Sequence, residues 1–297
     1  SVNNPRLWSP DDPFLYDLKL QLKDRRGKII DEVDSYFGMR SVAIGKVGDE
    51  NRILLNGEFV FQLGLLDQGY WPDGIFTAPT EEALLYDIEL AQRAGFNVIR
   101  KHIKVEPQRW YYHCDRLGLL VWQDMPNLWH PDDEDSVAVR KQFREEWKVI
   151  IDQHISSPSI IMWVPFNENR GAFEVTDITD WTKKEDPTRS VNGNSGYNYA
   201  PGYRPAYGDP GNGDFVDLHH YGKIEPKAMP RPDDKRAASL GEFGGKGLFV
   251  RDHMWPVRND AYEMMVNKDI LTDTYVMMLN ELEQMIKYFG LSAAIYT

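Results

Sequence analysis

Two glutamates each directly follow an almost wholly apolar segment of the chain. Glu168 follows IIMWVPFN, and Glu242 follows AASLG. Short apolar runs are typical of buried strands, so both carboxyl groups are expected at strand ends. Burial beside aromatic residues raises the pKa of a carboxyl group, which would prepare one of the two to donate a proton. A facing carboxyl pair is what cleavage of a glycosidic bond requires: one group protonates the leaving oxygen, and the other attacks the anomeric carbon or activates water.

Other polar residues follow apolar runs in the same way. For a single strand-end glutamate the ordinary alternative is a structural salt bridge, but a whole set of polar strand ends favours a site. The set comprises Arg100, Lys101, His102, Gln123, Asp124, Asn167, Asn169, His219, His220 and Tyr221. Only one of two adjacent histidines can point inward from a strand, and we expect His220, rather than His219, to lie nearer the pocket.

The segments that carry these residues alternate between strand-like and helix-like patterns from about residue 51. Eight apolar runs have strand character, at 59–66, 97–102, 119–125, 160–168, 190–194, 215–221, 238–243 and 292–297. Helical patterns occupy 80–95, 107–118 and 137–154, and 258–289 is long enough for more than one helix. The alternation predicts an α/β protein with a (β/α)8 TIM barrel, whose catalytic groups lie at the C-terminal ends of the strands. A doubly wound open sheet is the second choice.

The first 45 residues have a different pattern, in which strands and a charged turn follow one another as in an antiparallel sheet. Two or three strands do not make a stable domain by themselves. We therefore predict two parts, with 1–45 as the end of a β domain and 46–297 as the barrel. The last apolar run ends with the chain, so the barrel is expected to be truncated in or just after its eighth strand.

Composition excludes several classes of protein. The net charge is −12, from 34 basic and 46 acidic residues, which argues against a nucleic-acid partner. No apolar run approaches the roughly 20 residues of a membrane-spanning helix. The single cysteine, Cys114, excludes an intrachain disulfide and a CxxC metal motif. No metal and no cofactor is predicted, and the acidic run at 132–135 is expected to be solvated. The compartment stays open, with a periplasmic or secreted location if a signal peptide has been removed.

Several long segments resemble glycoside hydrolase family 2, which includes β-galactosidases, β-glucuronidases and β-mannosidases. The similar segments are ILLNGEFVFQLGLLDQGYWPDG at 53–74, AGFNVIRKHIKVEPQRWYYHCDRLGLLVWQD at 94–124, SPSIIMWVPFNE at 157–168 and LGEFGG at 240–245. WSPDDPFLYDLKLQL at 8–22 resembles the end of the immunoglobulin-like β-sandwich that precedes the barrel in this family. The resemblance therefore implies that 1–45 is the C-terminal part of an immunoglobulin-like domain and that 46–297 is a catalytic barrel.

The resemblance also implies roles for individual residues. Glu168 would be the acid/base and Glu242 the nucleophile, while Asn167 would bind the sugar 2-hydroxyl. His102 matches a histidine of the sugar pocket, with an ordinary hydrogen-bonded barrel histidine as an equal alternative. The remaining substrate-binding candidates are His220, Trp163 and Tyr221. Trp122 could also line the sugar site, but core packing is favoured for it.

The implied function is a retaining exo-β-glycosidase that acts on a carbohydrate substrate, most similar to a β-galactosidase. The Asn-x-Lys pattern that glucuronidases use for the sugar carboxylate is not evident, which disfavours a uronic acid. Two alternatives stay open: a carbohydrate-binding barrel fragment without turnover, and an endo-acting retaining hydrolase of a related barrel family. Assembly as a homo-oligomer is also left open.

Overall fold

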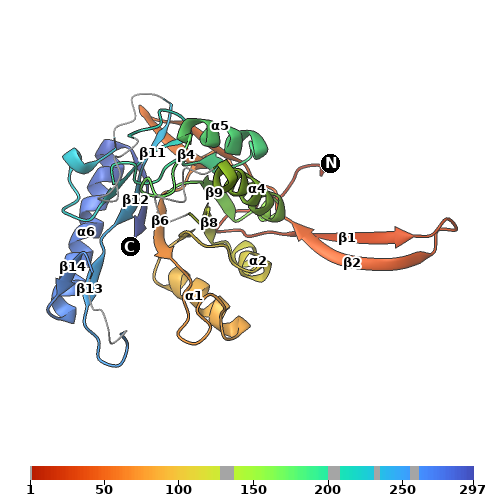
Figure 1. Ribbon diagram of the computed structural model, residues 1–297, viewed down its shortest axis with the longest axis horizontal. Coiled ribbons are helices and arrows are strands. Elements are labelled where there is room, and N and C mark those ends of the chain that lie inside the picture. The colour runs from red at the N-terminus through yellow and green to blue at the C-terminus, as the bar shows by residue number, and fades with distance from the viewer. Residues whose placement is uncertain (1, 128–136, 200–207, 231–234, 255–260) are drawn as a thin grey trace.

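The computed structural model describes residues 2–127, 137–199, 208–230, 235–254 and 261–297. Eight parallel strands form one sheet in the order β10-β9-β8-β7-β6-β15-β12-β11, which curls into a nearly closed barrel (Figure 1). The strands are β6 (Gln62–Asp67), β7 (Val98–Lys101), β8 (Leu120–Asp124), β9 (Ile160–Val164), β10 (Ser190–Val191), β11 (Phe215–His220), β12 (Ala237–Phe243) and β15 (Leu291–Tyr296). Each overlaps one of the eight predicted runs, and the predicted barrel is confirmed. The acidic run at 132–135 lies outside the described residues.

Between β10 and β11 the described residues form no strand ladder, and Asp214 provides the backbone contact that joins these two strands. The Asp214 N–H donates to the carbonyl of Val191 at 2.8 Å. In return, the Asp214 carboxylate accepts from the Val191 N–H at 2.7 Å and from Lys183 at 3.0 Å. These contacts bring the ends of β10 and β11 together on the side of the barrel opposite to β6 and β7.

Helices cover the outside of the barrel: α1 (Glu81–Arg93), α2 (Gln108–Leu117), α4 (Val137–His154), α5 (Val175–Glu185) and α6 (Lys268–Phe289) (Figure 1). The Thr80 hydroxyl caps α1 by accepting from the Ala83 N–H at 3.2 Å. Gly118 ends α2 with a φ of 77°, where a Cβ would lie 2.5 Å from the Pro10 carbonyl oxygen. The predicted helical region at 258–289 contains a short strand, β14 (Glu263–Met265), which pairs with β13 (Lys246–Leu248), and then the single helix α6.

The N-terminal part consists of a hairpin and a small sheet. β1 (Tyr16–Lys23) and β2 (Ile29–Phe37) form an antiparallel hairpin that extends away from the barrel (Figure 1). β3 (Val42–Val47), β4 (Glu50–Leu55) and β5 (Glu58–Phe59) form a three-stranded sheet. Arg52 of β4 donates to the Leu291 carbonyl at 2.6 Å, so this sheet covers the N-terminal end of the barrel. The predicted domain boundary at residue 45 falls within β3 and stays a prediction.

A buried ion pair supports the outer layer where α5 ends. The Asp186 carboxylate accepts from Arg189 at 2.6 Å and from the Trp163 indole at 2.9 Å, and its side chain is fully buried. Burial opposes the charged form, but the Arg189 guanidinium and the hydrogen bonds outweigh it and lower the pKa of Asp186 to about 2. The charged carboxylate therefore stabilises the folded state.

Asp186→Asn is expected to lower the free energy of unfolding at pH 7 by about 3 kcal/mol, because Arg189 would stay buried without its counter-charge. The folded pKa lies below that of the unfolded chain, so the contribution is present above about pH 4 and is lost as the pH falls toward 2. Urea unfolding at pH 7 and pH 3 should show a smaller difference from wild type at pH 3. Asp177→Asn, exposed on the same helix, is the control. An equal difference at both pH values would contradict the assignment.

Candidate active site

Glu168 is held by an unusual backbone conformation just after β9. Its φ is 52° and that of Asn169 is 60°, in the left-handed region that side chains other than glycine rarely adopt. The Glu168 N–H donates to the Ser195 carbonyl at 2.8 Å, which fixes this turn against the segment after β10. The side chain is 95% buried, since Glu168 retains 5% exposure. Strained conformations of this kind persist mainly at functional sites.

Glu242 lies at the C-terminal end of β12, across the barrel axis from Glu168. Its Oε2 accepts from the Tyr221 hydroxyl and, at 3.5 Å, from the Thr297 hydroxyl. Its Oε1 has no hydrogen-bond partner among the described residues but faces Arg100 Nη1 at 3.5 Å and His102 Nε2 at 3.6 Å. One carboxylate oxygen is therefore anchored, and the other is directed into the site.

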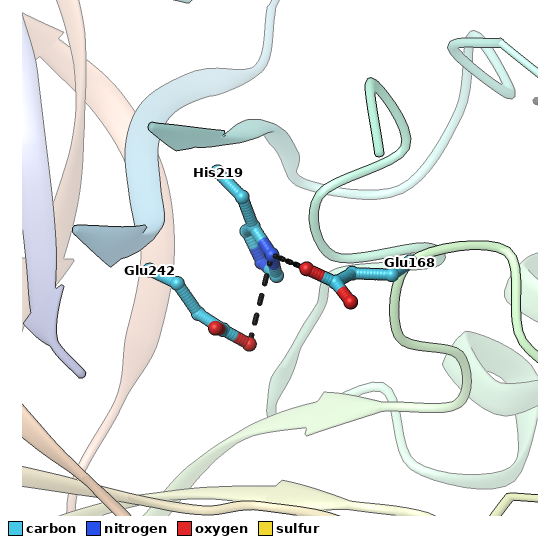
Figure 2. A group of neighbouring side chains, drawn as sticks. All are labelled: Glu168, His219 and Glu242. Atoms are coloured by element: carbon cyan, nitrogen blue, oxygen red, sulfur yellow. Dashed lines mark hydrogen bonds and ion pairs between the residues drawn. The ribbon is translucent and has the colours of Figure 1, made fainter. Parts of the chain in front are cut away.

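His219 lies between the two glutamates, as Figure 2 shows. Its Nδ1 is 2.9 Å from Glu168 Oε1 and 3.6 Å from Glu242 Oε1. One ligand atom from each of the three side chains lies within 4.8 Å of the others, so the two carboxyl groups face each other across a short gap. These atoms are also a donor set for a cation, but Arg170 already lies 3.0 Å from Glu168 and Arg100 lies beside Glu242. The positive charge that the carboxylates need is thus supplied by the chain itself.

Arg100, at the end of β7, connects the strands that carry the site. It is fully buried and donates to both oxygens of Asp124, at 3.1 and 2.9 Å. It also donates to Asn167 Oδ1 at 2.8 Å and to the Gly241 carbonyl at 3.1 Å. Burial disfavours its charge, but the carboxylates of Asp124 and Glu242 outweigh this and raise the pKa of the guanidinium. Arg100 therefore positions both residues that precede the glutamates, Asn167 and Gly241.

Asn167 and His102 are placed beside the glutamates, in positions suited to a ligand. Asn167 Oδ1 is used by Arg100, while its Nδ2 has no hydrogen-bond partner among the described residues. His102 Nδ1 lies 3.0 Å from the amide Nε2 of Gln68 and accepts from it, which leaves the ring proton on Nε2 toward Glu242. Burial, with the nearby charge of Arg100, lowers the pKa of His102 well below its usual value, so the ring is neutral at pH 7.

The structure brings Tyr221 into the site and corrects two other predictions. His219, not His220, points inward; the His220 Nε2–H instead donates to the Lys223 carbonyl at 2.8 Å. Trp163 does not line the pocket, because its side chain points outward from β9 and packs on Trp147 of α4, with ring centroids 5.5 Å apart. Trp122 is buried inside the barrel core, the placement that was favoured for it.

The pKa of Glu168 differs from the sequence-based expectation. Burial does raise it, but the hydrogen bond with His219 and the charges of Arg170 and Arg100 outweigh burial and hold it below the usual value. The expectation of a raised pKa is therefore wrong for Glu168 in the free protein.

Four polar residues behind His219 were missed by sequence reasoning: Asp217, Asn192, Ser195 and Ser239. Asp217 accepts from Asn192 at 2.6 Å, from the Ser195 hydroxyl at 2.6 Å, from Ser239 at 3.0 Å and from the Gly241 N–H at 2.5 Å. Ser195 Oγ lies 3.0 Å from His219 Nε2. Asp217 precedes His219 by two positions on β11, so the alternation of a strand is the one signal that relates them.

Comparison with protein families gives matches over most of the chain. The model described as "Glycosyl hydrolases family 2, TIM barrel domain" matches residues 52–201, and "Glycosyl hydrolases family 2" matches 1–40. A putative β-glucuronidase of Formosa agariphila is 32% identical over 199 residues, covering 66% of this chain and 19% of that protein. A β-galactosidase of Lactococcus lactis is 29% identical over 197 residues, covering 64% and 19%. The chain thus spans about one fifth of the length of these relatives.

Solved structures show the same fold. A β-glucuronidase of Bifidobacterium dentium superposes with a TM-score of 0.76 at 16% identity, covering 99% of this chain and 49% of that one. A β-glucuronidase of Parabacteroides merdae gives a TM-score of 0.75 at 19% identity, covering 99% and 38%. In the part of the chain that the structure describes, no helix is both long and apolar enough to cross a membrane.

Proposed function

Because the chain belongs to glycosyl hydrolases family 2, we propose that it carries the catalytic machinery of a retaining exo-β-glycosidase. The observation that carries the proposal is the facing pair Glu168 and Glu242, each at the C-terminal end of a barrel strand. Both carboxyl groups are buried, and each has its own set of donors. The pair has the residue types and placement that glycosidic bond cleavage requires.

In the proposed reaction, Glu242 Oε1 attacks the anomeric carbon while Glu168 protonates the leaving oxygen. Water then attacks the glycosyl-enzyme intermediate, with Glu168 as general base. Tyr221 holds the other oxygen of Glu242, and Arg100 stabilises its negative charge. The unpaired Nδ2 of Asn167 and the Nε2–H of His102 are donors available to sugar hydroxyl groups.

The distance between the carboxyl groups supports retention over inversion. Facing oxygens of Glu168 and Glu242 lie within 4.8 Å of each other. Carboxyl groups of retaining glycosidases are about 5–5.5 Å apart, while inverting enzymes need about 6.5–9.5 Å to admit a water molecule. Proton NMR of the first-formed product would show a β-anomer for retention, and an α-anomer would refute the mechanism.

The proposed substrate is a terminal β-linked sugar, with β-galactosides first. The missing Asn-x-Lys pattern is the reason to place β-galactosides before β-glucuronides, although relatives of both names match. A panel of nitrophenyl β-glycosides tests the order directly. Faster turnover of the β-glucuronide than of the β-galactoside would reverse it.

Glu168→Ala is expected to lower kcat/KM for an alkyl β-glycoside by roughly 10²–10⁴-fold, the usual contribution of a general acid. The loss should be much smaller for a dinitrophenyl β-glycoside, because that leaving group departs without a proton. A series of aryl glycosides with graded leaving-group pKa measures this slope. Glu283→Gln, an exposed glutamate on α6, is the control. Equal losses for all leaving groups would exclude Glu168 as the acid.

A further inference from the structure

We propose that His219 is a positioning residue that shares the catalytic proton with Glu168, and that Asp217 and Ser195 orient its ring for this purpose. The inference rests on the proposed function of Glu168 as general acid and extends it to three residues behind the site. It follows from the directions of the hydrogen bonds in the chain from Asp217 to Glu168.

Asp217 sets the direction of the first hydrogen bond. Both of its oxygens accept hydrogen bonds, Oδ1 from Ser239 and the Gly241 N–H, and Oδ2 from Asn192 and Ser195. A carboxylate surrounded in this way accepts on every side and has no proton to donate. The Ser195 hydroxyl, 2.6 Å away, must therefore use its only proton toward Asp217.

Ser195 in turn determines which nitrogen of His219 carries a proton. Because the serine proton is used, Ser195 Oγ accepts from His219 Nε2, 3.0 Å away, and Nε2 must be protonated. Arg100 Nη1 also faces Nε2, but at 3.4 Å, and it donates more closely to the Gly241 carbonyl. The shorter bonds thus select the form with hydrogen on Nε2.

The second nitrogen of His219 then shares one proton with Glu168. Nδ1 and Glu168 Oε1 are 2.9 Å apart, a distance that two unprotonated atoms would not keep. Either the carboxylic acid donates to Nδ1 or the imidazolium donates to the carboxylate, so the pair holds one proton in both cases.

The surroundings of His219 hold the ring in place and balance its charge. Gly196 has a φ of 64°, and a Cβ there would lie 2.4 Å from the ring, so the backbone packs directly on the imidazole. Asn198 bonds both backbone groups of His219, at 2.9 and 3.0 Å. The charged and titratable groups that face the ring are Glu168, Glu242, Arg100, His102, Tyr199 and, through Ser195, Asp217.

The proton balance over one catalytic cycle is simple. In the first step the Glu242–carbon bond forms, the glycosidic carbon–oxygen bond breaks, and the shared proton passes through Glu168 to the leaving oxygen. In the second step the water oxygen bonds to the anomeric carbon, the Glu242–carbon bond breaks, and a water proton returns to the Glu168–His219 pair. The pair is therefore restored without any further reactant.

His219→Gln tests the role through the pH dependence of turnover. With two coupled groups the last proton is lost at a higher pH than from the carboxyl group alone. In the variant, we expect the alkaline limb of the kcat/KM profile to shift to lower pH by about one unit or more. For alkyl β-glycosides we expect kcat/KM to fall by roughly 10²-fold, with dinitrophenyl glycosides changed much less. If the alkaline limb of the pH profile does not shift, or if kcat/KM falls equally for alkyl and dinitrophenyl glycosides, His219 has only a structural role.

Three further variants sharpen the test. Ser195→Ala should shift the alkaline limb of kcat/KM in the same direction as His219→Gln. Ser195→Thr keeps the hydroxyl and should leave the limb at its wild-type position. His220→Gln removes the neighbouring imidazole outside the site and should change neither rate nor profile. A shift in His220→Gln, or no difference between the two Ser195 variants, would overturn the proposal.

Two-bond proton–nitrogen NMR of the His219 ring gives a readout that does not need turnover. The expected spectrum has hydrogen on Nε2 throughout the pH range in which the chain is folded, with the signals assigned by their loss in His219→Gln. An unprotonated Nε2 would refute the inference about His219, even if Glu168 is the general acid. Conversely, unchanged hydrolysis in a Glu242 variant would remove the proposed function while leaving this spectrum interpretable.

Discussion

Replacing Glu242 with glycine is expected to lower kcat for an aryl β-glycoside by roughly 10⁴-fold or more, the scale on which loss of a catalytic nucleophile acts. Its Oε1 has no hydrogen-bond partner among the described residues and faces Glu168 across the site. The neighbouring buried carboxylate of Asp124 is not free to replace it, because both of its oxygens are bonded to Arg100. Steady-state hydrolysis of a nitrophenyl β-glycoside measures the loss.

Azide provides the control for this variant. The space left by the missing carboxylate admits a small anion that attacks the anomeric carbon in its place, so part of the turnover should return. Attack from the face that Glu242 used would give an α-glycosyl azide, which NMR identifies. Glu263→Gly, on the exposed strand β14, should keep wild-type turnover. Full activity of Glu242→Gly without azide would refute its role as nucleophile.

Arg100→Met is expected to lower the free energy of unfolding by about 3–5 kcal/mol, the cost of leaving a buried charge without its partner. Asp124 is 1% exposed at its side chain and would lose both hydrogen bonds from the guanidinium. Asn167 and the Gly241 carbonyl would lose their donor in the same substitution. Urea unfolding at pH 7 measures the change.

A second substitution separates charge from packing in this experiment. Asp124→Asn in the Arg100→Met background removes the unpaired carboxylate and should recover part of the lost stability. Arg100→Lys keeps the charge but not the two-pronged geometry, so we expect an intermediate loss. A loss below about 1 kcal/mol in Arg100→Met, the scale of an exposed ion pair, would contradict the assigned role.

The barrel and the polar ends of its strands were predictable because hydrophobic runs and strand ends are local features. Glu168 and Glu242 each follow a run that folds as a central strand, β9 and β12, buried on both faces. Parallel strands of a barrel end at the same face, so the meeting of the two glutamates follows from topology. This part of the prediction needed no knowledge of side-chain packing.

The direction of individual side chains was less predictable, for a physical reason. β9 is apolar at every position, so its pattern does not show that Trp163 faces the helices while Met162 and Val164 face the barrel interior. β11 begins with two apolar residues, and only the structure shows that Asp217 and His219 share the inward face. A strand buried on both faces loses the alternation that would reveal its orientation.

The hydrogen-bond network around Ser195 could not be predicted from the sequence, because residues in loops form it. Ser195 lies in a segment rich in glycine and asparagine, where no periodic pattern applies. Its position depends on backbone hydrogen bonds to Phe166 and Glu168, in the turn that follows β9. The lowered pKa of Glu168 was missed because His219 reaches it from β11, while Arg170 reaches it from its own turn.

The closure of the barrel between β10 and β11 has a consequence for catalysis. Asn192 and Ser195, which follow β10, both reach across this gap to Asp217 on β11. The side-chain hydrogen bonds that orient His219 therefore also hold β10 and β11 together. At the backbone, these two strands are joined mainly by Asp214. Widening of this seam between the two strands would release the imidazole from its serine and leave Glu168 without a fixed proton partner. In the proposed mechanism, the tightness of this barrel seam would therefore help to set how Glu168 holds its proton.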